Sequence, residues 1–399
     1  MPIAWKAPPR IKGVAKRLLT NSFAGRYRRL KPFNDQLDIF DTSLWSWLTP
    51  VAREEYKWVT MGLPEPRGEK WLIPTSTETP DTIAIECLEE VGVFPLSFSL
   101  PDSHSVPEKQ KLRQVARIIP GTPYKFTNQG DYLNEYETSH FALTFRKGGW
   151  DCFRHLEIIR SGAIPIMIDA RRIPRYSMIH YPKRVMVHVV EHLLTSGDLP
   201  TPELRSYFAE HLATYQTSIS MARYLLRMSK LENTRRVLFV DQRLSNRVDY
   251  LSVMTLIGLK QLLGAQCIAL PDPSYLYRDW SGSTHDFYGR GFGYTRVLDP
   301  SLRTERHSGA SGRLIRRIKQ DDFDALIVGS ISRNGPLATR LLAEFPAERT
   351  IWVHGEDVPP SPRELHYLRE AKVNVFVRSV PDRNGGLPDS GRHNESSSA

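Results

Sequence analysis

The stretch 141-FALTFRKGGWDCFRHLEIIRSGAIPIMID-169 decides the fold class, because it predicts a strand, a glycine loop, a helix and a second strand in succession. Phe141 to Phe145 is a short run of apolar and aromatic residues that ends in a basic loop containing two glycines. Gly162 is expected to end the helix. Ile164 to Ile168 is then expected to be a buried strand with Asp169 at its carboxyl end.

The helix of this unit is expected to place polar and apolar residues on opposite sides. The apolar side gathers Cys152, Phe153, Leu156 and Ile159. Asp151, the expected N-cap, joins Arg154 and Glu157 on the polar side. A glycine loop that leads into a helix presents backbone N–H groups at the carboxyl edge of a sheet, where anions bind. By spacing alone, a solvated Arg–Glu pair explains the polar side equally well.

The segment from Phe94 to Lys183 resembles exostosin-like glycosyltransferases, most densely in WDCFRHLEIIRSGAIPIMID. In that family a glycine loop precedes Asp/Ser-x-x-Arg-x-x-Glu and then a Gly-x-x-Pro turn. The run Lys-Gly-Gly-Trp-Asp-Cys-x-Arg-His-x-Glu-Ile is closer still to a group of bacterial and viral glycosyltransferases. The resemblance implies an α/β fold of the glycosyltransferase B type, in which two Rossmann-like parallel-sheet domains face a cleft. It also implies a nucleotide-sugar donor site in this stretch.

The resemblance assigns a role to each polar residue of the donor stretch. The donor-binding residues are expected to be Arg146, Lys147, Gly148, Gly149, Asp151, Arg154 and Glu157. Fixed cations such as Arg154 would stabilise the charge that grows on a departing diphosphate, and no metal is then needed. Glu157 is expected to accept hydrogen bonds from the ribose, and Asp151 to cap the helix or orient Arg154. Tyr132 and Tyr136 are expected to pack near this site.

The second half of the chain alternates short apolar runs with helical patterns, which predicts a second parallel sheet. The expected strands are Arg236–Val240, Cys267–Leu270, Ala325–Val328, Ile351–Val353 and Val373–Val377. The expected helices are Tyr250–Leu263, Ser311–Lys319, Pro336–Glu344 and Pro362–Glu370. Gly289, Gly291 and Gly293 follow no clear strand and open no helix, so the fingerprint of a dinucleotide-binding dehydrogenase is not met.

An acceptor hydroxyl needs a base or a positioned carboxylate, which is expected to come from the second half. The candidates are Asp241, Asp249, Glu356 and Asp357, and the sequence does not choose among them. Asp249 is also placed to cap the helix from Tyr250.

These patterns predict five regions. They are a basic arm (1–35), a donor domain (36–200), a connecting helix (201–232), an acceptor-side domain (233–380) and a polar, disordered tail (381–399). In the first half we expect a strand over Trp71–Pro74, a helix over Ile83–Glu90, a strand over Phe94–Ser99, a basic helix over Pro107–Ile118 and one long helix over Thr201–Lys230. Most enzymes of this architecture place the acceptor domain first. The order here is therefore either permuted or that of one half of a larger assembly.

The positive charge is concentrated near the start of the chain. The formal net charge is +10, and residues 1–32 hold nine Lys or Arg and no acid, which leaves +1 for residues 33–399. A nucleic-acid-binding protein would carry basic charge over a folded face, so this class is disfavoured. The arm is expected to be a solvated leader, or to contact anionic lipid at a membrane surface.

The remaining composition indicates a protein of the cytoplasm. The cysteines Cys87, Cys152 and Cys267 are widely spaced and odd in number, which suits a reducing compartment. The sequence shows no apolar run of membrane-spanning length and no compact secretory signal. His188 and His192 lie four apart on an expected helix, but no third metal ligand accompanies them.

The sequence thus predicts a metal-independent glycosyltransferase that needs no cofactor beyond its nucleotide-sugar substrate. It would act on a glycan or lipid-linked acceptor in polysaccharide biosynthesis. The alternative is a non-catalytic protein that binds a nucleotide sugar or a glycan and derives from such an enzyme.

Overall fold

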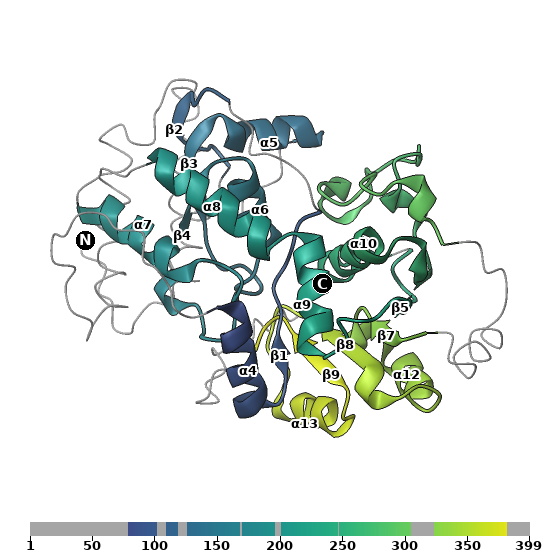
Figure 1. The fold of residues 1–399 in the computed structure, drawn as a ribbon. Helices are drawn as coiled ribbons and strands as arrows, with labels where there is room; N and C mark the ends of the chain where they lie inside the picture. The colour runs from purple at the N-terminus through teal and green to yellow at the C-terminus, as the bar shows by residue number, and fades with distance from the viewer. Residues whose placement is uncertain are drawn as a thin grey trace, which may run out of the picture.

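The computed structural model describes residues 79–101, 109–118, 126–167, 170–195, 201–245, 247–304 and 323–380. They form two parallel sheets flanked by helices, which lie side by side in Figure 1. The expected α/β class with two parallel sheets is confirmed. The expectations for the basic arm, Trp71–Pro74, Ser311–Lys319 and the tail all lie outside the described residues.

The larger sheet has six strands in the order β1-β9-β8-β7-β5-β6, and each neighbouring pair is parallel. The strands are β1 (Phe94–Pro95), β5 (Val237–Val240), β6 (Cys267–Leu270), β7 (Ala325–Val328), β8 (Thr350–His354) and β9 (Asn374–Val377). Nearly every residue in them is buried. Helices on both faces of a parallel sheet explain this burial, since neither face is left to water.

In the part of the chain that the structure describes, five helices belong to the larger sheet. They are α4 (Pro80–Val91), α9 (Ser218–Met228), α10 (Tyr250–Leu263), α12 (Ile331–Leu342) and α13 (Pro362–Glu370). Helices α9 and α10 cross closely at Gly258, where an added Cβ would lie 1.9 Å from the Ser218 carbonyl oxygen. A glycine is therefore required at this crossing. The expected bounds of α10 and α13 are confirmed, and α12 begins before the expected Pro336.

The smaller sheet has three parallel strands in the order β2-β3-β4. Its elements are β2 (Arg113–Val115), α5 (Gln129–Glu137), β3 (Ser139–Thr144), α6 (Phe153–Arg160), β4 (Ile164–Met167), α7 (Lys183–Thr195) and α8 (Thr201–Tyr215). The strand–loop–helix–strand unit predicted from the central stretch is thus confirmed as β3, α6 and β4. Single 3-10 turns cover 170–172, 264–266, 274–276, 288–291, 300–302 and 347–349.

Two expected helices were wrong. Of the expected basic helix over Pro107–Ile118, the described residues 109–118 instead contain the edge strand β2, because Arg113 N–H donates to the Thr138 carbonyl and Ala116 N–H to the Phe141 carbonyl. The long helix over Thr201–Lys230 is interrupted at Gln216 and Thr217. There the backbone turns to pair with Leu100, and the Thr217 hydroxyl caps α9 by accepting from Ser220 N–H.

The N-terminal elements contribute to the larger sheet, which changes the expected division of the chain. Strand β1 pairs in register with β9, Phe94 opposite Phe376 and Pro95 opposite Val377. Residues 94–95 fall inside the range 36–200 that was expected to form the donor domain. The small sheet is therefore inserted between the first and second strands of the larger one.

A fully buried lysine holds together residues of the segment that follows β6. Lys260 on α10 is paired with Asp272 at 3.1 Å and donates to the carbonyl of Leu302 and the hydroxyl of Thr304. Asp272 also accepts from Tyr277 O–H and Thr304 N–H. The network ties residues after β6 to residues some thirty positions later through one cation.

We expect Lys260→Ala to lower the free energy of unfolding by about 3–5 kcal/mol, because it leaves the Asp272 carboxylate buried without its cation. Urea denaturation measures this change. Arg227→Ala is the matched control, since it breaks the exposed pair with Asp81 and should cost less than about 1 kcal/mol. Equal losses in the two variants would contradict the structural role given to Lys260.

Candidate functional site

The loops at the carboxyl ends of the two sheets meet, and the contact involves the predicted glycine loop. Gly148 and Gly149 follow β3 and lie against Asp357, which follows β8 of the larger sheet. A Cβ added at Gly148 would lie 2.1 Å from Asp357 Oδ2, and one at Gly149 would lie 2.9 Å from the Asp357 carbonyl oxygen. A side chain at Gly149 would push the two loops apart, and one at Gly148 would displace the Asp357 carboxylate, so the two glycines permit the contact.

Arg378, which follows β9, joins the two sheets at this point. Its buried guanidinium donates through Nη1 to the Asp151 carbonyl (2.7 Å) and through Nε to the Gly355 carbonyl (2.9 Å). Its Nη2 is paired with the Asp357 carboxylate, and its Cζ lies 4.6 Å from the Phe98 ring centroid. The sequence prediction missed Arg378. The available signal was a cation placed directly after a buried strand.

Asp151 is a buried link between the sheets and not the expected N-cap. The N-cap of α6 is Cys152, which makes no side-chain capping bond. The Asp151 carboxylate instead accepts from Phe98 N–H (2.6 Å) and from Tyr181 O–H (2.8 Å). Burial raises the pKa of this carboxyl, while Arg378 and the two hydrogen bonds oppose the rise. The expected cap is wrong because the segment after β1, more than fifty residues earlier, takes the carboxylate.

The polar side of α6 is covered by protein and is not a solvated surface. Glu157 is buried and its Oε2 accepts from Tyr132 O–H at 2.6 Å. Tyr132 also packs edge-on against the equally buried Tyr136, so both tyrosines lie where they were expected. Burial raises the pKa of Glu157, and the charge of Arg154 partly offsets this rise. Arg154 Nε is buried without a hydrogen-bond partner among the described residues.

The basic loop after β3 places its two cations differently. Arg146 stacks over Trp150, with Cζ 4.9 Å from the ring centroid, whereas Lys147 is exposed. Partial burial of its side chain, and then the neighbouring charge of Arg154, lower the pKa of Lys147. Two cations that disfavour one another in this way make an environment that an anion would stabilise.

His155 holds the glycine loop from beneath and was not singled out by the sequence. It is fully buried, and its Nε2 donates to the Trp150 carbonyl at 3.0 Å while Nδ1 contacts the Thr144 hydroxyl at 2.8 Å. The residue before the loop and the residue that ends it are therefore fixed by one imidazole ring.

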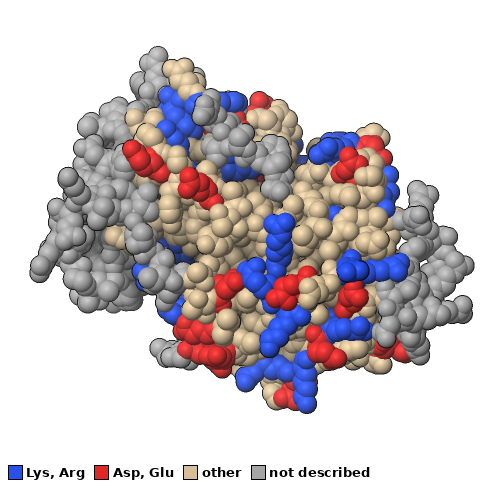
Figure 2. Space-filling view, viewed as in Figure 1, with Lys and Arg blue, Asp and Glu red and all other residues tan. Residues whose placement is uncertain are grey.

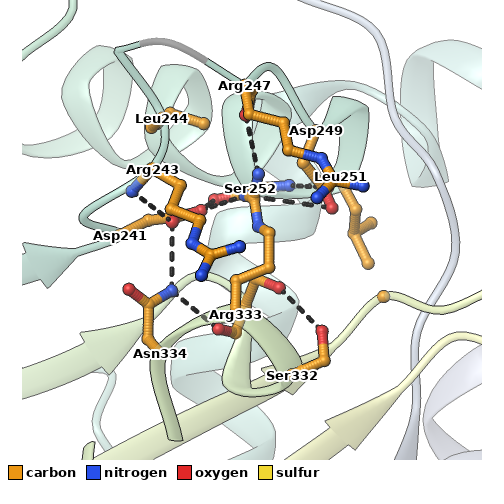
Figure 3. Close-up of polar contacts among 12 residues, drawn as sticks. Asp241, Arg243, Leu244, Arg247, Asp249, Leu251, Ser252, Ser332, Arg333 and Asn334 are labelled. Carbon is orange, nitrogen blue, oxygen red and sulfur yellow. Dashed lines mark hydrogen bonds and ion pairs between the residues drawn. The ribbon is translucent and has the colours of Figure 1, made fainter. Parts of the chain in front are cut away.

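Both carboxylate oxygens of Asp241, one of the four candidate bases, already accept hydrogen bonds (Figure 3). Its carboxylate is fully buried and accepts from Ser252 Oγ at 2.7 Å and from Asn334 Nδ2 at 3.0 Å. It also accepts from Arg243 N–H and is paired with Arg333 Nη2. A carboxylate with four donors is a structural anchor for β5, α10 and α12, and the sequence prediction of a base finds no support in this arrangement.

Asp249 differs from Asp241 because its two carboxylate oxygens are not equally bonded. Its Oδ1 accepts from Ser252 N–H at 3.0 Å, which confirms the predicted N-cap of α10. Its Oδ2 lies 3.9 Å from Arg333 Nη2, and a quarter of its side chain is exposed. Burial raises the pKa of this carboxyl. A partly accessible carboxylate with a raised pKa has the properties of a general base.

The position of Asp249 in the sheet adds to its interest. The chain runs from β5 to β6 on one side and then to β7 on the other, so the strand order reverses between β5 and β7. Ligands of open α/β sheets bind at such a reversal, outside the carboxyl ends of the strands. Arg333 and Asn334 at the start of α12 and Asp249 at the start of α10 lie there (Figure 3).

The other two candidates are exposed. Glu356 accepts from Ser332 Oγ at 2.5 Å, and Asp357 is paired with Arg378 while 62 % of its side chain is exposed. Glu356, Asp357 and Asp249 thus lie at the same carboxyl edge, and Asp357 alone of these three lies against the glycine loop. Asp169, at the end of the strand after α6, lies outside the described residues.

Aromatic contacts extend the junction beyond the polar residues. Phe153, the first residue of α6, stacks on Tyr250 of α10 with ring centroids 4.4 Å apart. The Gly289–Gly293 loop, which follows no strand, packs on the same pair: a Cβ at Gly289 would lie 2.1 Å from Tyr250 Oη, and one at Gly293 would lie 3.0 Å from the Phe153 ring. All three glycines of the run have positive φ. The run therefore shapes the junction and is not a dinucleotide loop.

Within the described ranges, no group of three or more His, Cys, Asp or Glu side chains is placed to hold a metal ion. No helix there has the length and apolar character needed to cross a bilayer. The face seen in Figure 2 carries acidic and basic side chains interspersed, without one continuous basic area. Comparisons with protein-family models, curated proteins and solved structures gave no match.

We expect Asp151→Ala to lower the free energy of unfolding by about 2–5 kcal/mol, because it leaves Phe98 N–H and Tyr181 O–H buried without an acceptor. Tyr181→Phe removes only the Tyr181 hydroxyl, and with it one of the two hydrogen bonds to the Asp151 carboxylate. The free energy of unfolding should therefore fall by only about 1 kcal/mol. Guanidinium denaturation of both variants tests the link. A loss in Asp151→Ala no larger than that in Tyr181→Phe would mean that Asp151 does not join the sheets.

The pH dependence of stability should report on Glu157. Because the pKa of Glu157 is raised in the folded state, the folded state is favoured while the carboxyl is protonated. The folded state is destabilised as the pH rises above about 4.5, the ordinary pKa of this carboxyl. Glu157→Gln still accepts from Tyr132 but cannot ionise. We therefore expect the variant to gain stability over the parent progressively with rising pH, as measured by urea denaturation at several pH values.

Tyr132→Phe provides the opposite test. Tyr132→Phe removes the hydrogen bond that favours the ionised form of Glu157. This variant should therefore lose stability with rising pH more steeply than the parent does. Parallel pH profiles for the parent, Glu157→Gln and Tyr132→Phe would show that Glu157 does not titrate in the way its burial implies.

Proposed function

We propose that the chain is a glycosyltransferase that moves a sugar from a nucleotide-sugar donor to a hydroxyl group of a glycan or lipid-linked acceptor. The observation that carries this proposal is the meeting of the Lys147–Gly149 loop with the carboxyl-end residues of the other sheet. Such a junction offers cations and backbone N–H groups from one sheet and carboxylates from the other. The resemblance of residues 94–183 to exostosin-like enzymes supports the same reading.

The donor would bind to the β3–α6 loop. Lys147 is exposed, Arg154 has a buried Nε without a partner among the described residues, and Arg146 lies over Trp150. These cations would stabilise the negative charge that develops on the departing diphosphate, the task a metal performs in other transferases. Glu157 would accept from the ribose, with Tyr132 holding its other oxygen in place. Asp151 would act through position only, by fixing the start of α6.

The acceptor hydroxyl would be deprotonated by Asp249. Of the four carboxylates proposed from the sequence, Asp241 is saturated with donors, and Asp357 is engaged by Arg378. Glu356 is exposed on its loop and bonded to Ser332. The carboxyl of Asp249 has a raised pKa, and its Oδ2 lies 3.9 Å from Arg333 Nη2, beyond hydrogen-bond distance. Asp249 also lies where the strand order reverses. It would take the proton from the acceptor oxygen as that oxygen attacks the anomeric carbon and the nucleoside diphosphate leaves.

A panel of nucleotide sugars tests the proposal. The purified chain is incubated with each donor, with and without a mixture of glycan acceptors, and released nucleoside diphosphate is measured. Release of diphosphate from one class of donor supports transferase activity. Tight binding of a nucleotide sugar without release would favour the non-catalytic binding protein, and neither binding nor release with any donor would overturn both readings.

With the active donor in hand, we expect Asp249→Asn to lower kcat at least about a hundredfold, because Asn caps α10 nearly as well but cannot accept a proton. Its melting temperature should stay close to that of the parent. Glu356→Gln removes a neighbouring carboxylate at the same sheet edge and should leave kcat within about twofold. A matching fall in both variants would show that Asp249 has no special part in proton transfer.

We expect Lys147→Met to raise the donor Kd about tenfold, since an exposed cation next to the diphosphate contributes a charge-assisted hydrogen bond. Isothermal titration with the nucleoside diphosphate measures the change. Lys183, a second lysine of the same half that bonds to the Arg175 carbonyl, supplies the control Lys183→Met. An unchanged Kd in Lys147→Met would remove the donor role from this loop.

A further inference from the structure

The Asp357 side chain occupies an unusual place at the junction. Its Oδ2 lies over Gly148 so closely that a Cβ there would be 2.1 Å away, and its Oδ1 is paired with Arg378 Nη2. Ser379 Oγ donates to the Asp357 carbonyl at 3.0 Å, so the backbone is held while the side chain remains 62 % exposed. The carboxylate is therefore an exposed anion on a backbone that is held in place.

The surroundings of this carboxylate are those that suit a phosphate group. Gly148 of the small sheet lets the carboxylate approach the loop, the buried Arg378 of the larger sheet pairs with it, and its charge also acts on Lys147. Arg378 is fixed in advance, since Nη1 and Nε are already bonded to the Asp151 and Gly355 carbonyls. Only Nη2 points to the exchangeable partner. A planar guanidinium fixed in this way loses little freedom when it binds an anion.

We propose that the Asp357 carboxylate sits in the anion subsite for the donor's diphosphate, and that the diphosphate displaces it. This inference rests on the proposed function and deepens it. The subsite consists of Lys147 and Gly148 from the small sheet and Arg378 Nη2 from the larger one. Arg378 thus becomes a donor-binding residue, and Asp357 an internal competitor that holds the site closed to weaker anions.

The exchange is physically favourable for a diphosphate in particular. Asp357 brings a single negative charge, and its exposed side chain can rotate into water at small cost. A diphosphate brings more charge and more acceptor oxygens to the same two cations. A singly charged anion gains little by the exchange, so the competitor also selects for the charge of its replacement.

Inorganic pyrophosphate is the probe, because it carries the diphosphate without the sugar or the nucleoside. Its Kd is measured by isothermal titration at neutral pH and one ionic strength, without divalent cations. We expect Asp357→Ala to bind pyrophosphate about fivefold more tightly than the parent, the range of one exposed ion pair. Glu356→Ala removes an equal charge from the adjacent position, which does not touch Gly148, and should change the Kd less than about twofold.

Asp357→Asn guards against a fold defect in the alanine variant, because asparagine can still accept from Arg378 Nη2. It should also bind pyrophosphate more tightly than the parent. Lys147→Met combined with Asp357→Ala should abolish the gain. Equal gains in the 356 and 357 variants, which would reflect net charge alone, or weaker binding in both Asp357 variants, would overturn the inference.

These outcomes are separate from those of the transferase assay. Tighter pyrophosphate binding in Asp357→Ala, with no diphosphate released from any nucleotide sugar, would keep the anion subsite and reject the transferase. Diphosphate release by the parent, with pyrophosphate affinity unchanged in Asp357→Ala and Asp357→Asn, would keep the transferase and reject the subsite.

Discussion

The bond from Arg378 to the Asp151 carbonyl, together with the bond from Phe98 N–H to the Asp151 carboxylate, is the constraint on which the rest of the structure depends. The carbonyl and the carboxylate of Asp151 are both held by the larger sheet, although Asp151 itself directly precedes the N-cap of α6 in the smaller one. Burying these charges is costly, and only full hydrogen bonding offsets that cost. The glycine loop directly precedes this link along the chain, and α6, whose first residue Phe153 stacks on Tyr250, directly follows it.

Titratable groups from both sheets collect around the link with pKa values displaced by burial. Asp151, Glu157 and Asp249 have raised pKa values, and Lys147 has a lowered one. Asp151 depends on both sheets, because Arg378 and Phe98 N–H of the larger sheet act on its carboxyl. Glu157 is instead bonded to Tyr132 of its own sheet, and the groups that act on Asp249 belong to the larger sheet. Clusters of titratable groups with displaced pKa values are typical of functional sites.

Much of the fold could be predicted from the sequence, because local signals were complete in several elements. Tyr250–Leu263 is bounded by a capping aspartate and a glycine, and Pro362–Glu370 by Ser361 with its capping box. The burial of the polar side of α6 could not be predicted, since a helical wheel assumes that polar residues face water. Here Tyr132 and the segment after β1 cover them. The place of Arg378 directly after a buried strand marks it as a candidate, but its partners Asp151 and Gly355 lie in distant segments, so the local pattern does not reveal what it binds.

The insertion of the small sheet into the larger one has a consequence for how the chain folds during synthesis. Phe94 pairs with Phe376, so the first strand of the larger sheet must wait for the last one. The elements of the small sheet lie within a shorter stretch and can associate much earlier. Until β9 leaves the ribosome, β1 has no partner in its sheet, and the nascent chain carries an unfinished edge that is open to wrong pairing. The order of translation thus sets the small sheet as the first folding unit and makes closure of the larger one the last step.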